Sequence, residues 1–253
     1  MQEKWLKIDP HTHTKGVSRC AWATVEEIID RKIEMGYDGM VLTNHCQRGY
    51  YPPEEHQNYV DRVLEEYEKG RRYAEEKGFR LWLGLEVSIW KPHYVDILLY
   101  GVTEEFLRAV QNPYELSQQQ LFNACKEYGV FMVQAHPYRE LPPNFEGGFT
   151  AQDLLDENFL HGAELNCSVR DLPRHDALIK EFSAKGLIVT CGVDDHGGST
   201  FFGGMLIPDT VTSGEEFARY LFNAKSTKIF REEKIDEFLC PKTTAKKGAT
   251  LGN

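Results

Sequence analysis

The sequence lacks several features that define common non-enzymatic classes. Its 253 residues hold no apolar run long enough to span a membrane, and the opening Met-Gln-Glu-Lys-Trp is not the apolar core of a secretory signal. The six cysteines form no CxxC pair and no disulfide-framework spacing. The formal net charge is −10, so the cationic surface that duplex nucleic acid needs is missing. We therefore expect a reduced, cytoplasmic protein with no membrane partner. No feature of the sequence indicates an oligomeric state.

Internal repeats, low-complexity segments and linker-like breaks are also absent. The length and the 41% hydrophobic content suit one large core and match the usual size of an α/β barrel. The alternating patterns predict a barrel of parallel strands in one domain, 1–240, and a flexible tail, 241–253. Expected strands are 5–8, 39–43, 79–85, 94–100, 130–135, 162–167, 187–191 and 227–230. Expected helices are 24–35, 54–77, 103–110, 117–128, 151–157, 173–185 and 214–223. In the first helix, Thr24 and Glu27 form a capping-box pattern, and the expected core stripe is Val25, Ile28, Ile29 and Ile33.

What the chain does have is histidine and carboxylate at the ends of predicted strands. His11 and His13 follow the first strand and, in extended geometry, point to the same side. Taken singly, each such residue is explained at least as well by an ordinary structural role in a loop or cap. Together they exceed what one tetrahedral ion needs, and a carboxylate such as Glu86 can bridge two ions, so two or three divalent ions are expected. The predicted set is His11, His13, His45, Glu86, His93, His136, Asp194 and His196, with Asp96 and Glu164 as further candidates.

Five motifs resemble, in order, those of the PHP (polymerase and histidinol phosphatase) superfamily. They are Asp9-Pro-His11-Thr-His13, Thr43-Asn-His45, Gly84-Leu-Glu86, Ala135-His136-Pro137 and Gly192-Val-Asp194-Asp-His196, and they extend from residue 8 to about 200. The resemblance implies a distorted (β/α)7 TIM-like barrel and a multinuclear zinc, manganese or iron site that hydrolyses phosphoesters. It further implies that His11, His13, Glu86 and Asp194 hold one ion. Glu86 would bridge to a second ion on His136, and His45 and His196 would contribute to a third. Asp9 would hydrogen-bond a histidine ligand.

The chain departs from this pattern at three places. Arg19 stands six residues beyond His13, where trinuclear members have a further His or Asp. Asn44 replaces the usual Asp before His45. The downstream partner of His136 is His93 or Asp96, and ligand type favours His93 over Asp96, although spacing favours Asp96.

The expected activity is that of an EC 3.1 hydrolase acting on a phosphomonoester or a small phosphodiester, with a metal-activated water as nucleophile. Asp194 or His196 would transfer a proton to the leaving oxygen, and Arg139 would assist. Two alternatives are an amidohydrolase-type C–N hydrolase and a non-catalytic metal-binding module. The first commonly uses a bridging carboxylated lysine where this chain has Glu86, and degenerate modules tend to lose ligands. Candidate phosphate-binding residues are Lys15, Arg19, Arg139 and Arg170.

Overall fold

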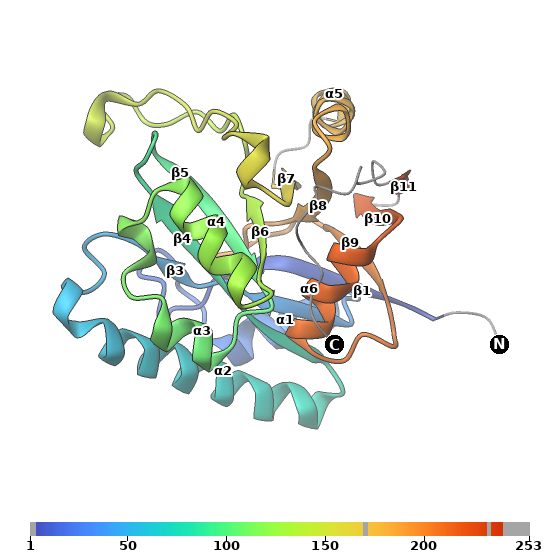
Figure 1. The fold of residues 1–253 in the computed structure, drawn as a ribbon. Coiled ribbons are helices and arrows are strands. Elements are labelled where there is room, and N and C mark those ends of the chain that lie inside the picture. The colour runs from blue at the N-terminus through green and yellow to red at the C-terminus, as the bar shows by residue number, and fades with distance from the viewer. Residues whose placement is uncertain (1–3, 169–171, 232–233, 240–253) are drawn as a thin grey trace.

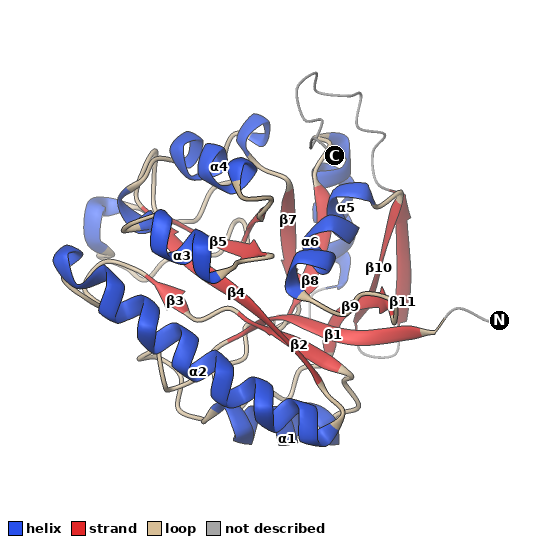
Figure 2. Cartoon of the chain, turned by 60° about the horizontal axis from the view of Figure 1, so that its bottom comes forward, coloured by secondary structure: helices blue, strands red, loops and turns tan. Residues whose placement is uncertain are grey.

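In the computed structural model, the strands form one mixed sheet with helices around it (Figures 1 and 2). The structure describes residues 4–168, 172–231 and 234–239. The predicted tail, 241–253, and Arg170 therefore lie outside the described residues. The strands are β1 (Trp5–Thr12), β2 (Gly39–Leu42), β3 (His45–Cys46), β4 (Arg80–Ile89), β5 (Val95–Tyr100), β6 (Phe131–Gln134), β7 (Gly162–Asn166), β8 (Ile188–Gly192), β9 (Gly203–Pro208), β10 (Ser226–Arg231) and β11 (Lys234–Leu239). The α-helices are α1 (Val25–Glu34), α2 (His56–Lys77), α3 (Glu104–Ala109), α4 (Gln118–Glu127), α5 (Leu172–Ala184) and α6 (Gly214–Asn223).

Seven strands form a nearly closed, distorted barrel in the order β1-β2-β4-β5-β6-β7-β8. A parallel bridge between Thr12 and Asp195 brings the end of β1 to the chain that leaves β8. Strands β9, β10 and β11 continue the sheet from the other edge of β1 through antiparallel pairs. The architecture is thus the distorted TIM-like barrel expected from the sequence.

The expectation that all barrel strands are parallel was wrong for β5. This strand is antiparallel to both β4 and β6, with Ser88 paired to Asp96 and Ile97 paired to Gln134. The cause is the short connection after β4, because residues 90–94 leave no room for the crossover helix that a parallel pair requires. As a result, residues at the start of β5 lie beside the carboxyl ends of its neighbours.

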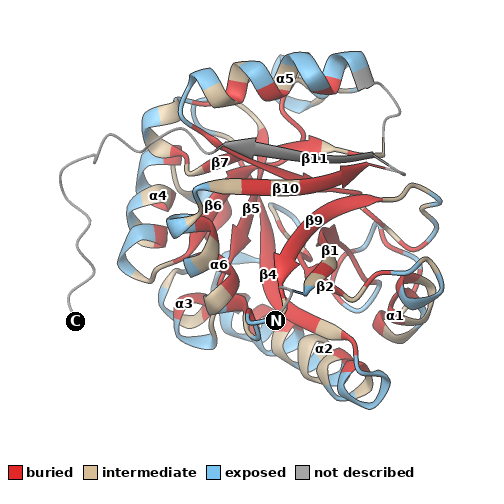
Figure 3. Ribbon diagram, turned by 90° about the vertical axis from the view of Figure 1, so that its right-hand side faces the viewer, coloured by how far each residue is buried: buried red, intermediate tan, exposed pale blue. Residues whose placement is uncertain are grey.

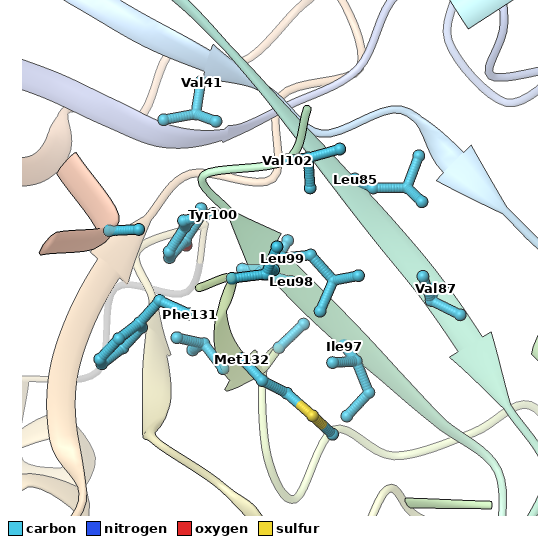
Figure 4. Close-up of a cluster of buried hydrophobic side chains, with 14 of the residues drawn as sticks. Val41, Leu85, Val87, Ile97, Leu98, Leu99, Tyr100, Val102, Phe131 and Met132 are labelled. Atoms are coloured by element: carbon cyan, nitrogen blue, oxygen red, sulfur yellow. The ribbon is translucent and has the colours of Figure 1, made fainter. Parts of the chain in front are cut away.

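The barrel strands are buried along almost their whole length, whereas the helices expose their outer faces (Figure 3). Strands β5, β6 and β8 have no exposed residue, as expected for a sheet covered on both sides. Figure 4 shows part of this core, where Ile97, Leu99 and Met132 pack between β4, β5 and β6. Among the described residues, no helix has the length and apolar character needed to cross a membrane.

Two local predictions need correction. The capping box of Thr24 and Glu27 forms, but Lys32 is the buried residue on the inner face of α1, while Ile33 is 37% exposed. Position 32 is seven residues after Val25 and so belongs to the same helical stripe. The helix expected at 151–157 is absent, and Ala151 instead forms an isolated bridge with Glu140.

Candidate metal centre

Seven of the eight predicted ligands converge at one end of the barrel. They come from the end of β1, from β3 and β4, and from the segments that follow β6 and β8. Within each of three groups, the candidate ligand atoms lie within 4.8 Å of one another. The groups are His11, Glu86 and His136; His11, His13 and Asp194; and His13, His45 and His196.

Glu86 is the carboxylate that joins these groups. Its Oε1 lies 3.3 Å from Nε2 of both His11 and His136. Its Oε2 lies 3.3 Å from His13 Nε2 and 2.8 Å from His45 Nδ1. Each oxygen of this fully buried side chain therefore faces a different pair of imidazoles, which is the arrangement of a carboxylate that bridges two cations.

The donor set fits a divalent ion in its spacing. Asp194 Oδ1 lies 3.3 Å from His11 Nε2 and 3.2 Å from His13 Nε2. Bond lengths of about 2.0–2.2 Å in a tetrahedral site place neighbouring ligand atoms about 3.3 Å apart. The donor atoms of His11, His13 and Glu86 are buried without a hydrogen-bond partner, and an ion would satisfy them.

Glu164 orients the His11 imidazole. Its Oε1 lies 2.9 Å from His11 Nδ1, so the ring is held with Nε2 directed at Glu86 and Asp194. Asp9 hydrogen-bonds His11, as the motif resemblance implied, but it does not fix the tautomer of the ring. Its Oδ1 accepts the backbone N–H of His11 rather than a ring N–H. The sequence identified Glu164 only as a further candidate, because nothing local links it to a histidine 153 positions away.

His136 is linked through Gln152 to Asp96 on the reversed strand β5. Gln152 Oε1 contacts His136 Nδ1 at 2.7 Å, and Gln152 Nε2 donates to Asp96 at 2.7 Å. Asp96 Oδ2 itself lies 4.0 Å from His136 Nε2. His93 is not brought into the cluster, because its Nε2 contacts the carbonyl of Asp153 at 2.9 Å. Of the two alternatives at this position, the structure places Asp96 beside His136.

Two of the converging residues have left-handed backbone conformations, which residues other than glycine rarely adopt. His136 has φ of 29° and Asp194 has φ of 56°. Such conformations cost about 1–3 kcal/mol each and cluster at functional sites. In this geometry His136 Nε2 lies 3.3 Å from Glu86 Oε1, and Asp194 Oδ1 lies 3.3 Å from His11 Nε2.

The electrostatics of the cluster favour added positive charge. Burial alone would lower the pKa of His11, but Glu164, Asp194 and Glu86 raise it well above the ordinary value. Burial also opposes ionisation of Glu86, yet the imidazoles hold its pKa well below the usual range. The pKa of His13 falls to about 3, first through burial and then through repulsion from His45. Protons and metal ions would therefore compete for the same nitrogens.

A buried lysine beneath the cluster was missed by the sequence reading. Lys32 Nζ lies 2.6 Å from Asp9 Oδ2 and 3.0 Å from Asp195 Oδ2. Burial alone would lower the pKa of Lys32, but the two carboxylates raise it above the usual value. The sequence did indicate this residue, because position 32 lies on the same helical stripe as Val25. Ile33 had been assigned to that stripe instead.

Gly192 supplies the space that the His11–Glu164 pair occupies. A Cβ at this position would lie 2.5 Å from Glu164 Oε1 and 2.6 Å from His11 Cβ. Any larger residue would therefore displace a histidine ligand or the carboxylate that orients it.

Two of the three departures from the motif pattern, Asn44 and Arg19, involve the loop after His13. Asn44 Oδ1 accepts hydrogen bonds from Thr14 N and Ser18 Oγ, each at 2.8 Å, so Asn44 positions this loop. The Arg19 guanidinium donates to the carbonyls of Gly49 and Tyr50 at 3.0 and 2.9 Å. It is therefore directed at residues 49–50.

The next residue, Cys20, has its Sγ 3.7 Å from the Tyr50 hydroxyl. Burial would raise the pKa of its thiol, but hydrogen bonds to His196 and His45 lower it to about 6. This cysteine was not among the predicted site residues. Its only signal was its position next to Arg19.

Of the three predicted phosphate-binding residues that the structure describes, only Arg139 lies against the cluster. Its Nη1 lies 3.3 Å from Asp194 Oδ2 and 3.2 Å from His136 Nε2, and its side chain is 52% exposed. Lys15 is exposed on the loop after His13. A cleft of about 260 Å³ opens beside the cluster and is lined by residues that include Asp194, His196, Trp22 and Phe201. A larger hollow of about 750 Å³ includes Arg19 and Tyr50 but none of the clustered ligands, so we take the smaller cleft as the candidate substrate site.

Comparison with solved structures finds this fold in other proteins at low sequence identity. A two-domain protein from Bacteroides vulgatus that contains a predicted PHP-like metal-dependent phosphoesterase has a TM-score of 0.61 and 20% identity, over 90% of this chain and 65% of that one. The lesion-specific endonuclease PfuEndoQ from Pyrococcus furiosus has a TM-score of 0.54 and 13% identity, over 89% of this chain and 58% of that one. An amidohydrolase from Chromobacterium violaceum has a TM-score of 0.52 and 16% identity, over 75% of this chain and 87% of that one.

Searches with the sequence against family models and against curated proteins find no match. At these identities the structural neighbours show the fold alone, and it is the fold that the resemblance of the five motifs implied. The chain spans 65% and 58% of the lengths of two of them, so their whole activities do not transfer directly. The chain thus has a PHP-like barrel fold with His, Glu and Asp groups that could hold metal ions.

Proposed function

We propose that this protein is a metal-dependent hydrolase of small phosphoesters, working with two or three divalent ions. The observation that carries the proposal is the position of Glu86, whose two oxygens face four imidazoles inside a buried cluster. Zinc, manganese and iron all accept such mixed imidazole and carboxylate donors. When bound, ions of this kind lower the pKa of a water molecule to about 7 and neutralise the negative charge of phosphoryl oxygens.

The first ion would be held by His11, His13, Glu86 and Asp194. The second would be held by Glu86 and His136, with Asp96 close by. Glu164 and Gln152 keep two of the imidazoles in the orientation that the ions need, since each contacts the ring nitrogen on the outer side.

Arg139 would bind the phosphate. Its guanidinium borders Asp194 and is half-exposed, so its remaining N–H groups are free to donate to a phosphoryl oxygen. Two roles are open to His196, whose side chain is 26% exposed and lines the cleft. It can donate a proton to the leaving oxygen or hold a third ion with His45.

The substrate side of the cleft suits a small organic ester. Trp22, which is 66% exposed, and Phe201 both line this cleft. Such aromatic faces would pack on a ring or an acyl group next to the phosphate. With a net charge of −10, the protein does not favour long nucleic acid.

The alternatives are less well supported by the same geometry. An amidohydrolase is among the similar folds, so the fold alone does not separate the two hydrolase classes. The residue whose two oxygens face the imidazoles is Glu86, however, at the place where amidohydrolases commonly use a carboxylated lysine. A non-catalytic module would have no need for a complete bridging arrangement around Glu86.

The proposal is tested with chelator-treated protein reloaded with Zn²⁺, Mn²⁺ or Fe²⁺. We expect turnover within a panel of p-nitrophenyl phosphate, bis-p-nitrophenyl phosphate and nucleotide monophosphates. Chelator and His13→Ala should abolish it. His93→Ala is the matched control and should retain activity, because His93 lies outside the cluster. A fully loaded protein that cleaves no phosphoester would refute the proposal, and fewer than one bound ion per chain would favour the non-catalytic module.

A further inference from the structure

One of the aromatic residues that line the cleft contacts the segment after β8 through both its backbone and its ring. The backbone N–H of Trp22 donates to the carbonyl of His196 at 3.0 Å. The indole lies against Gly198, because a Cβ at position 198 would be 2.2 Å from Trp22 Cζ2 and 2.8 Å from Trp22 Cη2. The six-membered ring of the indole therefore occupies space that only a glycine leaves free.

Further contacts join the segment that carries Trp22 to the segment after β8. The N–H of His13 donates to the carbonyl of Asp195 at 2.8 Å. On the other side of Trp22, a Cβ at Gly197 would lie only 2.6 Å from the Cβ of Ala23, so the two backbones approach closely there. Backbone contacts thus set the place of Trp22 before any ligand binds, which limits the entropy lost when a ligand packs on it.

The exposure of Trp22 is unusual for this protein. At 66%, it is the most exposed large hydrophobic side chain among the described residues. The two others, Ile33 and Phe222, are each 37% exposed and lie on helices α1 and α6. Trp22 instead lines the cleft of about 260 Å³ together with the candidate ligands Asp194 and His196. A single exposed apolar side chain is ordinary on an outer surface, but beside a buried polar cluster it indicates contact with a ligand.

We propose that Trp22 selects substrates in which the phosphate is esterified to an alcohol that carries a planar ring, with this ring packed on the indole. The proposal rests on the proposed phosphoesterase function and specifies its substrate class. Hydrolysis would consume one water and release the ring-bearing alcohol and inorganic phosphate. The cleft of about 260 Å³ lies just below the range of about 300–1,000 Å³ for drug-sized ligands, so it suits one ring beside a phosphate.

An aromatic pair is favoured beyond the apolar area that it buries. For one ring packed on one indole, this preference corresponds to about two- to tenfold tighter binding than for a saturated ring of the same size. The saturated ring is therefore the right comparison, because it buries a similar area without the aromatic contact.

Two matched monoesters test this selection in the metal-loaded protein. Benzyl phosphate and cyclohexylmethyl phosphate both release a primary alcohol, and they differ in whether the ring is planar. We expect kcat/KM to be about two- to tenfold higher for the benzyl ester, through a lower KM. In Trp22→Ala the ratio of the two kcat/KM values should fall to about one, whereas Trp22→Phe should keep part of the preference because a smaller aromatic face remains.

Gly198→Ala is a second variant that keeps the tryptophan in the chain. The added methyl group would overlap the indole, so the side chain must move, and the preference should fall as it does in Trp22→Ala. Bound metal per chain, from elemental analysis, should match the wild type in both variants, because neither residue belongs to the three ligand groups. A purely structural role would lower the activity on both esters alike and leave their ratio unchanged.

Binding without turnover provides a second readout. In 2-phenylethylphosphonate a methylene replaces the ester oxygen of benzyl phosphate, so the compound cannot be hydrolysed. It should change the tryptophan fluorescence of the metal-loaded protein and bind about two- to tenfold more tightly than 2-cyclohexylethylphosphonate. Trp22→Phe should remove the fluorescence change. Trp5→Phe is the matched control and should keep it, because Trp5 lies at the start of β1, at the opposite end of this strand from His11.

The outcomes separate this inference from the proposed function. Equal kcat/KM values for the two esters in the wild-type protein, or an unchanged ratio in Trp22→Ala, would overturn the role of Trp22. If the phenyl compound binds more tightly and changes the fluorescence of Trp22, but no phosphoester is cleaved, the ring-binding role stands and the proposed function fails. If phosphoesters are cleaved with no preference for a planar ring, the proposed function stands and this inference fails.

Discussion

The ion pair beneath the cluster gives the most direct test of how the site is held. Lys32 is fully buried on α1 and bonds Asp9 and Asp195, which belong to the two segments that supply His11 and Asp194. Lys32→Met keeps the apolar stem and removes the charge. The variant leaves two buried carboxylates without their cation.

The size of the effect follows from this burial. Removing one partner of a buried ion pair costs about 3–5 kcal/mol, because the remaining charge is uncompensated. Asp9 Oδ1 keeps the N–H of Val193, and Asp195 Oδ1 keeps the N–H of Gly197, so both carboxylates retain some compensation. We therefore expect the free energy of unfolding to fall by about 3 kcal/mol. This is a large part of the total, which is typically about 5–15 kcal/mol for a folded protein.

The loss should depend on pH with a definite sign. Burial opposes ionisation of Asp195, but Lys32 holds the pKa of Asp195 below its usual value. The ionised Asp195 therefore stabilises the fold at pH values above the usual pKa of an aspartate, and this contribution is lost as the pH falls. Without Lys32 the carboxylates become easier to protonate. The difference between Lys32→Met and wild type should therefore shrink from pH 7 toward pH 4.

Urea unfolding followed by circular dichroism measures this difference as a shift in midpoint. Lys69→Met is the matched control, because Lys69 forms an exposed pair with Glu26 at 2.9 Å and should change stability by only about 0–1 kcal/mol. If Lys32→Met lost no more stability than this control, the reasoning about the buried pair would be wrong.

Three other predictions concern the metal ligands. Glu164→Gln weakens the orientation of His11 and should lower metal affinity by about 10–100-fold in competition with a chelating dye; unchanged affinity would contradict its role. Gly192→Ala should displace His11 and reduce bound metal, as measured by elemental analysis, whereas Gly214→Ala has ordinary contacts and should not. Burial alone would lower the pKa values of His11 and His45, but nearby acidic groups raise both above 6.5. A metal ion must therefore displace protons from these imidazoles. Apparent affinity should therefore rise with pH above this value, with proton release in calorimetry, and a flat profile from pH 6 to 8 would contradict this.

Much of the fold and most of the site followed from local patterns. Alternating apolar runs and helical stripes predicted where most barrel strands and helices lie along the chain, because each pattern reports which face of one element is buried. Strand ends then identified His11, Glu86 and Asp194 as residues that would meet. Adjacent positions in a strand alternate in direction, so the spacing of His11 and His13 already implied a shared target.

What the sequence by itself determined is the set of candidate metal-binding side chains and their place at strand ends. The tertiary structure alone decided which neighbours complete them. The reversal of β5 placed Asp96 beside His136, and contacts across the sheet joined Glu164 to His11 and Lys32 to Asp9. The fold of one loop directed Arg19 at residues 49–50 and placed Cys20 beside the Tyr50 hydroxyl. These contacts depend on strand pairing between distant segments, whereas a periodic pattern describes only the element that contains it.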